Sequence, residues 1–238
     1  MTDPAVPTTG AAPTALPYGT PDAPRLAVRG EARLEVDAEI ARIAVTVSAR
    51  GTDRTTALTD LTRRNEAALT LIKSYGDAIE KLETGTFSLT PQLTDKGRHE
   101  RIRAYHGHVT HTATLNDFTL LGELTTRLAD LDLTRVDGPW WALRPDSPAH
   151  RAARTQAVHE AVQRAREYAE ALGARLDALL EVADLGAENN APTAPVMRSV
   201  AGYGGATQES APALDLEPQR QTVYAHLNAR FTMTRPAL

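Results

Sequence analysis

The chain has 238 residues, which is enough for one large domain or two small ones. Hydrophobic residues make up 42% of the sequence and aromatic residues 5%, so we expect a packed core built mainly from Leu, Val, Ile and Ala. The formal net charge is -4 and no basic stripe is present, which argues against a nucleic-acid partner. The absence of cysteine excludes disulfides, thiolate nucleophiles and cysteine-ligated metal sites.

Residues 1–24 are expected to form a disordered tail. They contain six prolines among Ala, Thr and Gly, and they offer little surface to bury. This segment lacks a basic region followed by an apolar one, so it does not read as a signal peptide. No apolar run approaches the roughly 20 residues that a membrane-spanning helix needs. We therefore expect a cytoplasmic protein without a membrane span.

The first half of the ordered chain shows two strands, a helix and two further strands. Apolar residues alternate over 26–36 and 43–49, and the short connection at 37–39 predicts an antiparallel hairpin. Thr52 or Asp53 is expected to cap a helix that Gly76 ends. Polar Asn65 interrupts its apolar stripe, and the stripe comprises Leu58, Leu61, Ala68, Leu69 and Ile72. Strand patterns return at 79–93, with Pro91 near the end, and at 102–115.

The second half continues with helices and strands in alternation. Asp117 is expected to begin a short helix, a strand follows at 135–143, and Asp146-Ser147-Pro148 begins a long helix to Leu172. The inner stripe of that helix comprises Ala153, Ala157, Ala161, Ala165, Tyr168 and Leu172. Strands are predicted at 176–185 and 223–231, separated by a long flexible loop at 186–221. The element order predicts an α+β fold with antiparallel sheets and a few packing helices.

Four stretches of the chain carry a family likeness. They are Val28-Arg29-Gly30-Glu31 with the strand at 41–47, the strand at 82–92 that ends in Pro91-Gln92, residues 105–117 with Leu121-Gly122-Glu123-Leu124, and Ala169-Glu170-Ala171-Leu172-Gly173 with Leu216-Glu217-Pro218. In this order, over nearly all of residues 25–234, they resemble the SIMPL-domain family. That bacterial and animal group includes exported immunogenic proteins and a protein that associates with a signalling kinase.

The resemblance implies an α+β fold of two interlocked subdomains, a tendency to self-associate and a link to stress responses. The domain would cover residues 25–185 and 222–234, with the loop 186–221 between them. Many relatives carry an export signal, whereas residues 1–24 of this chain show none. Because the family lacks an agreed set of catalytic residues, the resemblance assigns no residue a chemical role.

The histidines of the predicted strand 102–115 are the densest titratable group. His106 and His108 project from the same face, about 7 Å apart, so they could share a metal ion with a third ligand. The alternative is two exposed imidazoles on a solvated sheet face. His111 points the other way, onto the predicted core side. No Asp or Glu stands at an obvious ligating offset, so we expect no bound metal.

Other candidate chemistry is weaker. No serine stands in a Gly-x-Ser-x-Gly elbow, and Gly202-Tyr203-Gly204-Gly205 lacks the Lys-Ser/Thr of a phosphate-binding loop. The carboxylate pairs Asp130/Asp132 and Glu31/Glu35 are interpreted as solvated surface charge. We therefore expect no catalytic residue, no cofactor and no enzymatic activity.

The adjacent Trp140 and Trp141 suggest an interface. Neighbouring residues of a strand face opposite ways, so one tryptophan can enter the core while Trp140 points outward; alternatively, a helix covers both. Trp140 and Tyr203 are the possible interface residues. The sequence favours a non-enzymatic module that forms homo-oligomers or binds a protein partner. The alternative is a small-molecule or metal-binding protein that uses His106 and His108.

Overall fold

The computed structural model describes residues 19–93, 102–184 and 214–237. The chain divides into two compact units, each assembled from segments that are separate in the sequence. The three-stranded unit contains the described residues up to 34, those of 148–184 and those from 223 onward. The four-stranded unit contains the described residues of 35–147 and 214–222.

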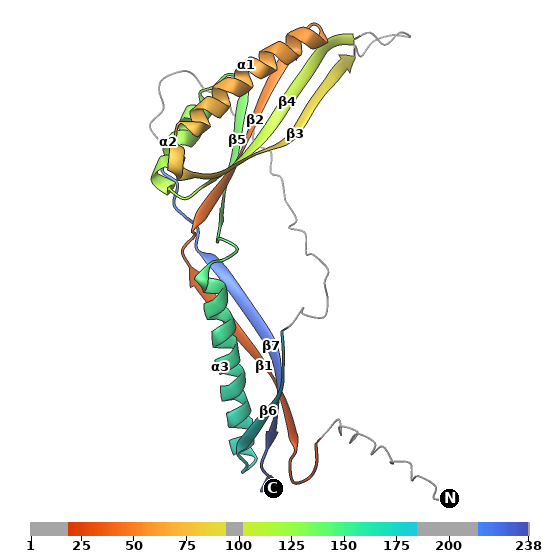
Figure 1. Cartoon of the computed structure of the whole chain (residues 1–238), viewed down its shortest axis with the longest axis vertical. Coiled ribbons are helices and arrows are strands. Elements are labelled where there is room, and N and C mark those ends of the chain that lie inside the picture. Colours follow the sequence, from red (N-terminus) through yellow and green to blue (C-terminus); the bar gives the residue numbers. More distant parts are fainter. Residues whose placement is uncertain (1–18, 94–101, 185–213, 238) are drawn as a thin grey trace, which may run out of the picture. The chain divides into compact units, whose positions relative to one another are not determined.

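The four-stranded unit packs two helices on one face of an antiparallel sheet (Figure 1). Its elements are β2 (Ile40–Gly51), α1 (Arg54–Lys73), a short 3-10 turn η1 (Gly76–Ala78), β3 (Ile79–Leu93), β4 (Ile102–Leu115), α2 (Phe118–Ala129) and β5 (Thr134–Ala142). The strands lie in the order β3-β4-β2-β5. Its core joins Ile43, Val45 and Val47 of β2 to the leucines of α2 and to Ile72 of α1.

The two helices of this unit begin where the sequence predicts. Asp53 Oδ1 accepts a hydrogen bond from the Thr56 backbone N–H at 2.9 Å, and Asp117 Oδ1 accepts one from Thr119 at 2.9 Å. The bonds from the Thr56 backbone and hydroxyl lower the pKa of Asp53, because they stabilise its ionised form. Of the two predicted caps of α1, Asp53 and not Thr52 is the N-cap, and Asp117 is confirmed as the N-cap of α2.

The three-stranded unit packs one long helix on a second sheet. Its elements are β1 (Arg25–Val36), α3 (Pro148–Ala171), β6 (Leu176–Asp184) and β7 (Gln221–Met233), and the strands lie in the order β1-β7-β6. Figure 1 shows α3 running along this sheet. The residues that α3 buries are Ala153, Ala157, Ala161, Ala165 and Ala169. β7 buries every second residue from Val223 to Met233, as its alternation predicts.

The predicted hairpin between the first two strands is wrong. β1 pairs with β7, whereas β2 pairs with β4 and β5 in the other sheet. The chain passes from one unit to the other at Leu34 and Glu35, just before the connection at 37–39. Alternating apolar residues determine which face of a strand is buried, but they do not identify its partner strand.

Two predicted helix stripes need correction at single positions. Leu58 is 43% exposed, and Leu61 is the first leucine of α1 to be buried. Tyr168 is 53% exposed, and Ala169 takes its place because α3 buries every fourth residue without a break. α1 ends at Lys73 with Ser74 as its C-cap, so Gly76, at a φ of 53°, comes two residues after the cap. The predicted α+β class and the order of helices and strands are confirmed.

Candidate functional site

The face of the four-stranded sheet opposite its helices carries polar side chains, and we call it the outer sheet face. The pairing of β2 with β4 places Arg50 beside His106, Ser48 beside His108 and Thr46 beside Thr110 along this face. Further along, it pairs Arg42 with Thr114. The hydroxyls of Thr46 and Thr110 lie 3.1 Å apart, within hydrogen-bonding distance. Polar groups from neighbouring strands therefore share one surface.

His106 and His108 both lie on this outer sheet face, as the alternation predicts. Arg50 Nε donates a hydrogen bond to His106 Nε2 at 2.5 Å, and Arg50 also donates to Gln92 Oε1 at 3.1 Å. A guanidinium beside His106 repels a metal cation and occupies Nε2, one of the two imidazole nitrogens that can bind a metal. Among the described residues, no group of three or more His, Asp or Glu side chains is arranged to hold a metal ion. The contact with Arg50 thus disfavours the metal alternative.

His111 lies on the opposite face and is buried beneath α1, with 1% of its surface exposed. Its Nε2 lies 2.5 Å from Asn65 Oδ1, and its Nδ1 lies 3.1 Å from the Thr84 hydroxyl. With Asn65 as acceptor, Nε2 carries the proton and Thr84 donates to Nδ1, so the neutral imidazole is fully satisfied. Burial lowers the pKa of His111, because a charged ring would lose its hydration. Asn65, which interrupts the helix stripe, is the partner that this buried histidine requires.

Trp140 and Trp141 lie on opposite faces of β5. Trp141 packs against the core and meets Phe118 edge-to-face at 4.8 Å between ring centroids. Trp140 is 47% exposed and pairs with Arg42 of β2 on the outer sheet face. This is the arrangement with one tryptophan inside and one outside. Tyr203, the other predicted interface residue, lies outside the described residues.

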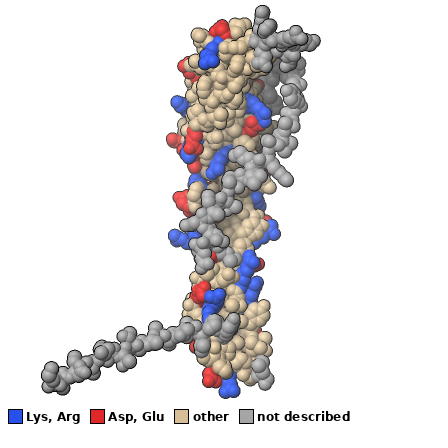
Figure 2. Space-filling view, turned by 90° about the vertical axis from the view of Figure 1, so that its right-hand side faces the viewer, with Lys and Arg blue, Asp and Glu red and all other residues tan. Residues whose placement is uncertain are grey.

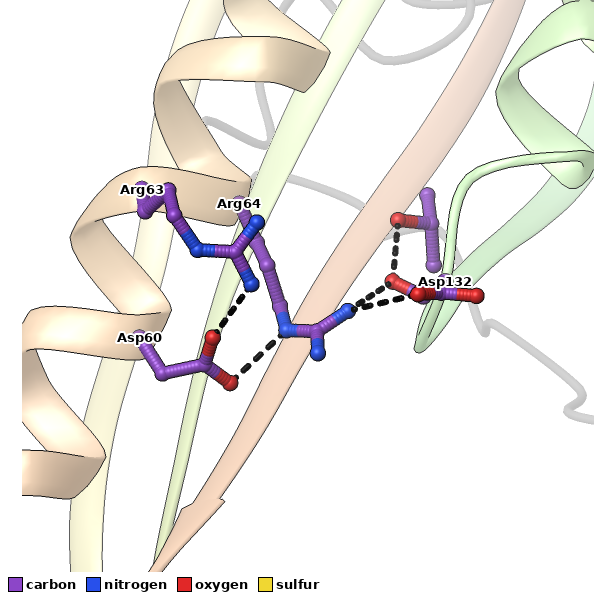
Figure 3. Close-up of polar contacts among 5 residues, drawn as sticks. Asp60, Arg63, Arg64 and Asp132 are labelled. Carbon is purple, nitrogen blue, oxygen red and sulfur yellow. Dashed lines mark hydrogen bonds and ion pairs between the residues drawn. The ribbon is translucent and has the colours of Figure 1, made fainter.

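A charged cluster joins α1 to the connection between α2 and β5 (Figure 3). Arg64 Nε donates to Asp60 Oδ2 at 2.8 Å, and Arg64 Nη1 donates to the backbone oxygen of Asp132 at 3.1 Å. Hydrogen bonds from Arg64 and Arg63 lower the pKa of Asp60. The next residue, Leu133, has a φ of 52°, which is unfavourable for a leucine. We interpret the cluster as a clamp that holds this tight turn, because its charges are used within the fold.

A hollow of about 470 Å³ opens at one end of the outer sheet face. It is lined by the first residues of β2 and β3, the last residues of β4 and the connection at 144–146, all within the four-stranded unit. Arg42, Lys81 and Arg144 contribute positive charge, and Glu80, Glu83 and Asp146 contribute negative charge. Sequence reasoning missed this hollow, because its charged residues are dispersed along the chain.

A second surface lies on β6, an edge strand of the three-stranded sheet. Leu179, Leu180 and Val182 are 57%, 48% and 48% exposed. Beside them, a smaller apolar hollow of about 160 Å³ lies between α3 and the sheet, and Val158 and Val182 line it. The sequence carried a signal for this surface in the adjacent Leu179 and Leu180, since both are apolar. The register of β6 with β7 shifts between Leu179 and Glu181, so alternation alone does not give the face of Leu180.

Residues 214–220, which fall in the predicted long loop, run along the four-stranded unit without regular structure. The Leu214 backbone N–H donates to the Thr126 hydroxyl at 3.2 Å, and Leu216 packs against the core. A side chain at Gly122 of α2 would meet the Leu214 carbonyl oxygen at 2.2 Å, so glycine is needed there. With Phe118 of α2, this segment forms a further hollow of about 410 Å³.

The charge distribution gives no single-sign surface on the face that Figure 2 shows, where acidic and basic side chains are interspersed. None of the described helices combines the length and apolar character that crossing a bilayer requires. The model of one family, SIMPL, described as a protein of unknown function (DUF541), matches residues 26–231. A search of the curated proteins found no match to this chain.

Proposed function

Because this chain belongs to the SIMPL family, whose description assigns no activity, we propose its function from its own surfaces: it is a non-enzymatic module that self-associates through β6. The observation that carries the proposal is the exposed run of Leu179, Leu180 and Val182 on an edge strand. We include two further predictions in this proposal: a role in stress responses, which the family resemblance suggests, and a cytoplasmic location.

The two edges of the three-stranded sheet differ in their suitability for pairing. An edge strand presents backbone N–H and C=O groups that a further strand can bind, and charged side chains usually protect such an edge. β1, at one edge, exposes the ion pair of Arg29 and Glu31. β6, at the other edge, exposes Leu179, Leu180 and Val182 in addition to the ion pair of Glu181 with Arg230 of β7. An added strand would bury these apolar side chains and satisfy the backbone groups together.

A second copy of β6 is the occupant that fits this edge. Antiparallel pairing about a two-fold axis at Leu180, where the register of β6 with β7 shifts, would place Leu180 opposite its own copy and Ala178 opposite Val182. In this register the acidic residues Asp177, Glu181 and Asp184 do not lie directly opposite one another. Two three-stranded sheets would thereby join into one continuous sheet across the axis.

The small core of the three-stranded unit also supports the pairing of β6 with a second copy. α3 contributes only alanine side chains to its buried stripe, so its packing removes less apolar surface from water than a leucine stripe would. Additional burial at β6 would offset this deficit. Trp140, exposed on the edge strand β5 of the other sheet, is available as a second contact and would allow assemblies larger than a dimer.

The proposal is tested by measuring molar mass with light scattering at tens of micromolar protein. We expect a multiple of 25.7 kDa for the unmodified chain and the monomer mass for Leu180→Lys. Leu58→Lys is the matched control, because Leu58 is similarly exposed on α1 and should keep the assembly intact. Trp140→Ser should leave dimers and remove only larger species. A monomeric unmodified chain would contradict self-association.

A cross-link locates the contact. The natural sequence has no cysteine, so Leu180→Cys introduces a single thiol, and a two-fold axis at this position brings two copies together. Mild oxidation should yield a covalent dimer of Leu180→Cys and leave Leu58→Cys monomeric. If both variants cross-link equally, or neither does while the chain is dimeric, the pairing of β6 at this register is wrong.

A further inference from the structure

The hollow on the outer sheet face has walls that are fixed before any ligand binds. The Arg144 backbone N–H donates to Glu39 Oε2 at 2.9 Å, and the Ser147 hydroxyl donates to Glu39 Oε1 at 2.7 Å. The Arg144 guanidinium also forms an ion pair with Glu80 at the start of β3. These bonds fasten the connection at 144–147 against β2 and β3, so the wall is pre-organised.

Six charged residues line the hollow, and four of them form two ion pairs, Arg144 with Glu80 and Lys81 with Glu83. Arg144 holds Glu80 and lowers its pKa through their hydrogen bond, so that carboxylate stays ionised. Lys81 Nζ lies 2.8 Å from Glu83 Oε1. The remaining charged residues of the lining are Arg42 and Asp146. Neither forms an ion pair with another residue that the structure describes, although Asp146 contributes, after Glu80 and Glu39, to the raised pKa of Arg144.

The remaining lining determines what kind of molecule fits. Thr112 and Thr114 supply hydroxyls from β4, and Ile40 and Pro145 supply apolar surface. Trp140, 47% exposed, occupies the β5 position paired with Arg42, next to the residues that line the hollow. A volume of about 470 Å³ is within the usual range for small-molecule sites, roughly 300–1,000 Å³.

We propose that this hollow binds a small zwitterion, a free amino acid with an apolar side chain. Arg42 binds the carboxylate, since a guanidinium matches that group with two parallel hydrogen bonds. Asp146 binds the ammonium group, and Trp140 covers the apolar side chain. A simple anion or a simple cation satisfies only one of the two charges, and the other is then left without a partner as water is displaced.

The first test compares three probes by isothermal titration calorimetry with the full chain. L-leucine is the zwitterion, 4-methylpentanoate lacks its amino group, and 3-methylbutylamine lacks its carboxylate. We expect leucine to bind and each half-molecule to bind at least about tenfold more weakly, equivalent to about 1.4 kcal/mol. Equal binding of leucine and either half-molecule, or no heat from leucine at 10 mM, would overturn the proposal.

The second test locates the site with three variants. Arg42→Gln and Asp146→Asn should each weaken leucine binding by at least about tenfold, and both residues are exposed, so the fold should survive. Arg135→Gln is the control, because Arg135 also lies on the outer sheet face but forms its ion pair with Asp137. Circular dichroism confirms folding. Unchanged binding in Arg42→Gln would place the ligand elsewhere, whatever the assembly state of the chain.

Tryptophan fluorescence provides a readout that is independent of heat. Leucine bound beside Arg42 should change the emission of Trp140, whereas Trp141 packs in the core against Phe118. The change should disappear in Trp140→Phe and persist in Leu180→Lys, which tests self-association separately. A signal that persists in Trp140→Phe would contradict the placement of the apolar side chain.

Discussion

The two units place helices on antiparallel sheets with side chains of different size. The four-stranded unit buries leucine, isoleucine and valine between its layers, whereas the three-stranded unit buries five alanines of α3. Alanine brings the helix backbone close to the sheet. A side chain at Gly30 of β1 would stand 2.1 Å from the Ala157 carbonyl oxygen. The four-stranded unit gains stability from the apolar area that its large side chains bury, and the three-stranded unit gains it from the close approach of α3 to the sheet.

This difference also explains where the apolar surface is left exposed. The four-stranded unit covers the leucines of α2 completely, so Leu121, Leu124 and Leu128 are fully buried. The three-stranded unit instead leaves Leu179 and Leu180 of its edge strand in contact with solvent. The three-stranded unit, whose helix buries only alanines and whose edge strand exposes leucines, therefore gains more apolar burial from a partner than the four-stranded unit does.

The largest expected loss of stability comes from removing a leucine from the core of the four-stranded unit. Leu124→Ala should lower the free energy of unfolding by about 2–5 kcal/mol, since it removes buried apolar area and leaves a cavity. Ala161→Gly in α3 should cost only about 1 kcal/mol, mainly through helix propensity. Urea denaturation of the two variants measures the contrast. Equal losses would mean that the alanine interface contributes as much as the leucine core.

A smaller effect is expected from adding one methyl group to the close-packed unit. Gly30→Ala should cost about 1–3 kcal/mol, because the new Cβ would meet the Ala157 carbonyl and, at 2.7 Å, the Ala161 Cβ. Gly85→Ala on β3 is the control, since the nearest atom to its new Cβ is the Thr110 carbonyl oxygen at 3.5 Å. Thermal unfolding of both variants measures the difference. A Gly30→Ala variant as stable as the control would show that α3 can move away from β1.

Local features of this fold could be predicted from the sequence, whereas the pairing of strands could not. Asp117 could be identified as a cap and the cap of α1 narrowed to Thr52 or Asp53, because a cap depends on a few adjacent residues. The alternation in β7 correctly gave its buried face. The partner of β1 is β7, nearly 200 residues later, and no local pattern encodes such a distant contact.

The same contrast between local patterns and long-range pairing applies to the candidate sites. Strand parity correctly placed His106 and His108 on one face and His111 on the other. It could not show that Arg50 donates to His106, because β2 and β4 are brought together only by folding. The hollow beside Arg42 was missed for the same reason, since Arg144 and Glu80 meet across 64 residues of sequence.

The smallest expected effect is a pH dependence of stability that comes from His111, the buried histidine of the four-stranded unit. The pKa of His111 is lowered by burial in the folded chain, so the unfolded chain takes up a proton more readily as the pH falls through its ordinary value of about 6.5. The stabilising contribution of the neutral ring is therefore fully present above that pH and is lost progressively below it. We expect the free energy of unfolding to decrease between pH 7.5 and 5.5.

His111→Gln keeps polar atoms near Asn65 and Thr84 but cannot titrate, so its free energy of unfolding should change less over the same pH interval. Asn65→Ala tests the geometry at fixed pH. It leaves the His111 Nε2–H without its acceptor and should cost about 1–3 kcal/mol at pH 7.5. Urea titrations at the two pH values measure both variants. If His111→Gln retains the full pH dependence, another group titrates, and the interrupted stripe of α1 serves some purpose other than holding this ring neutral.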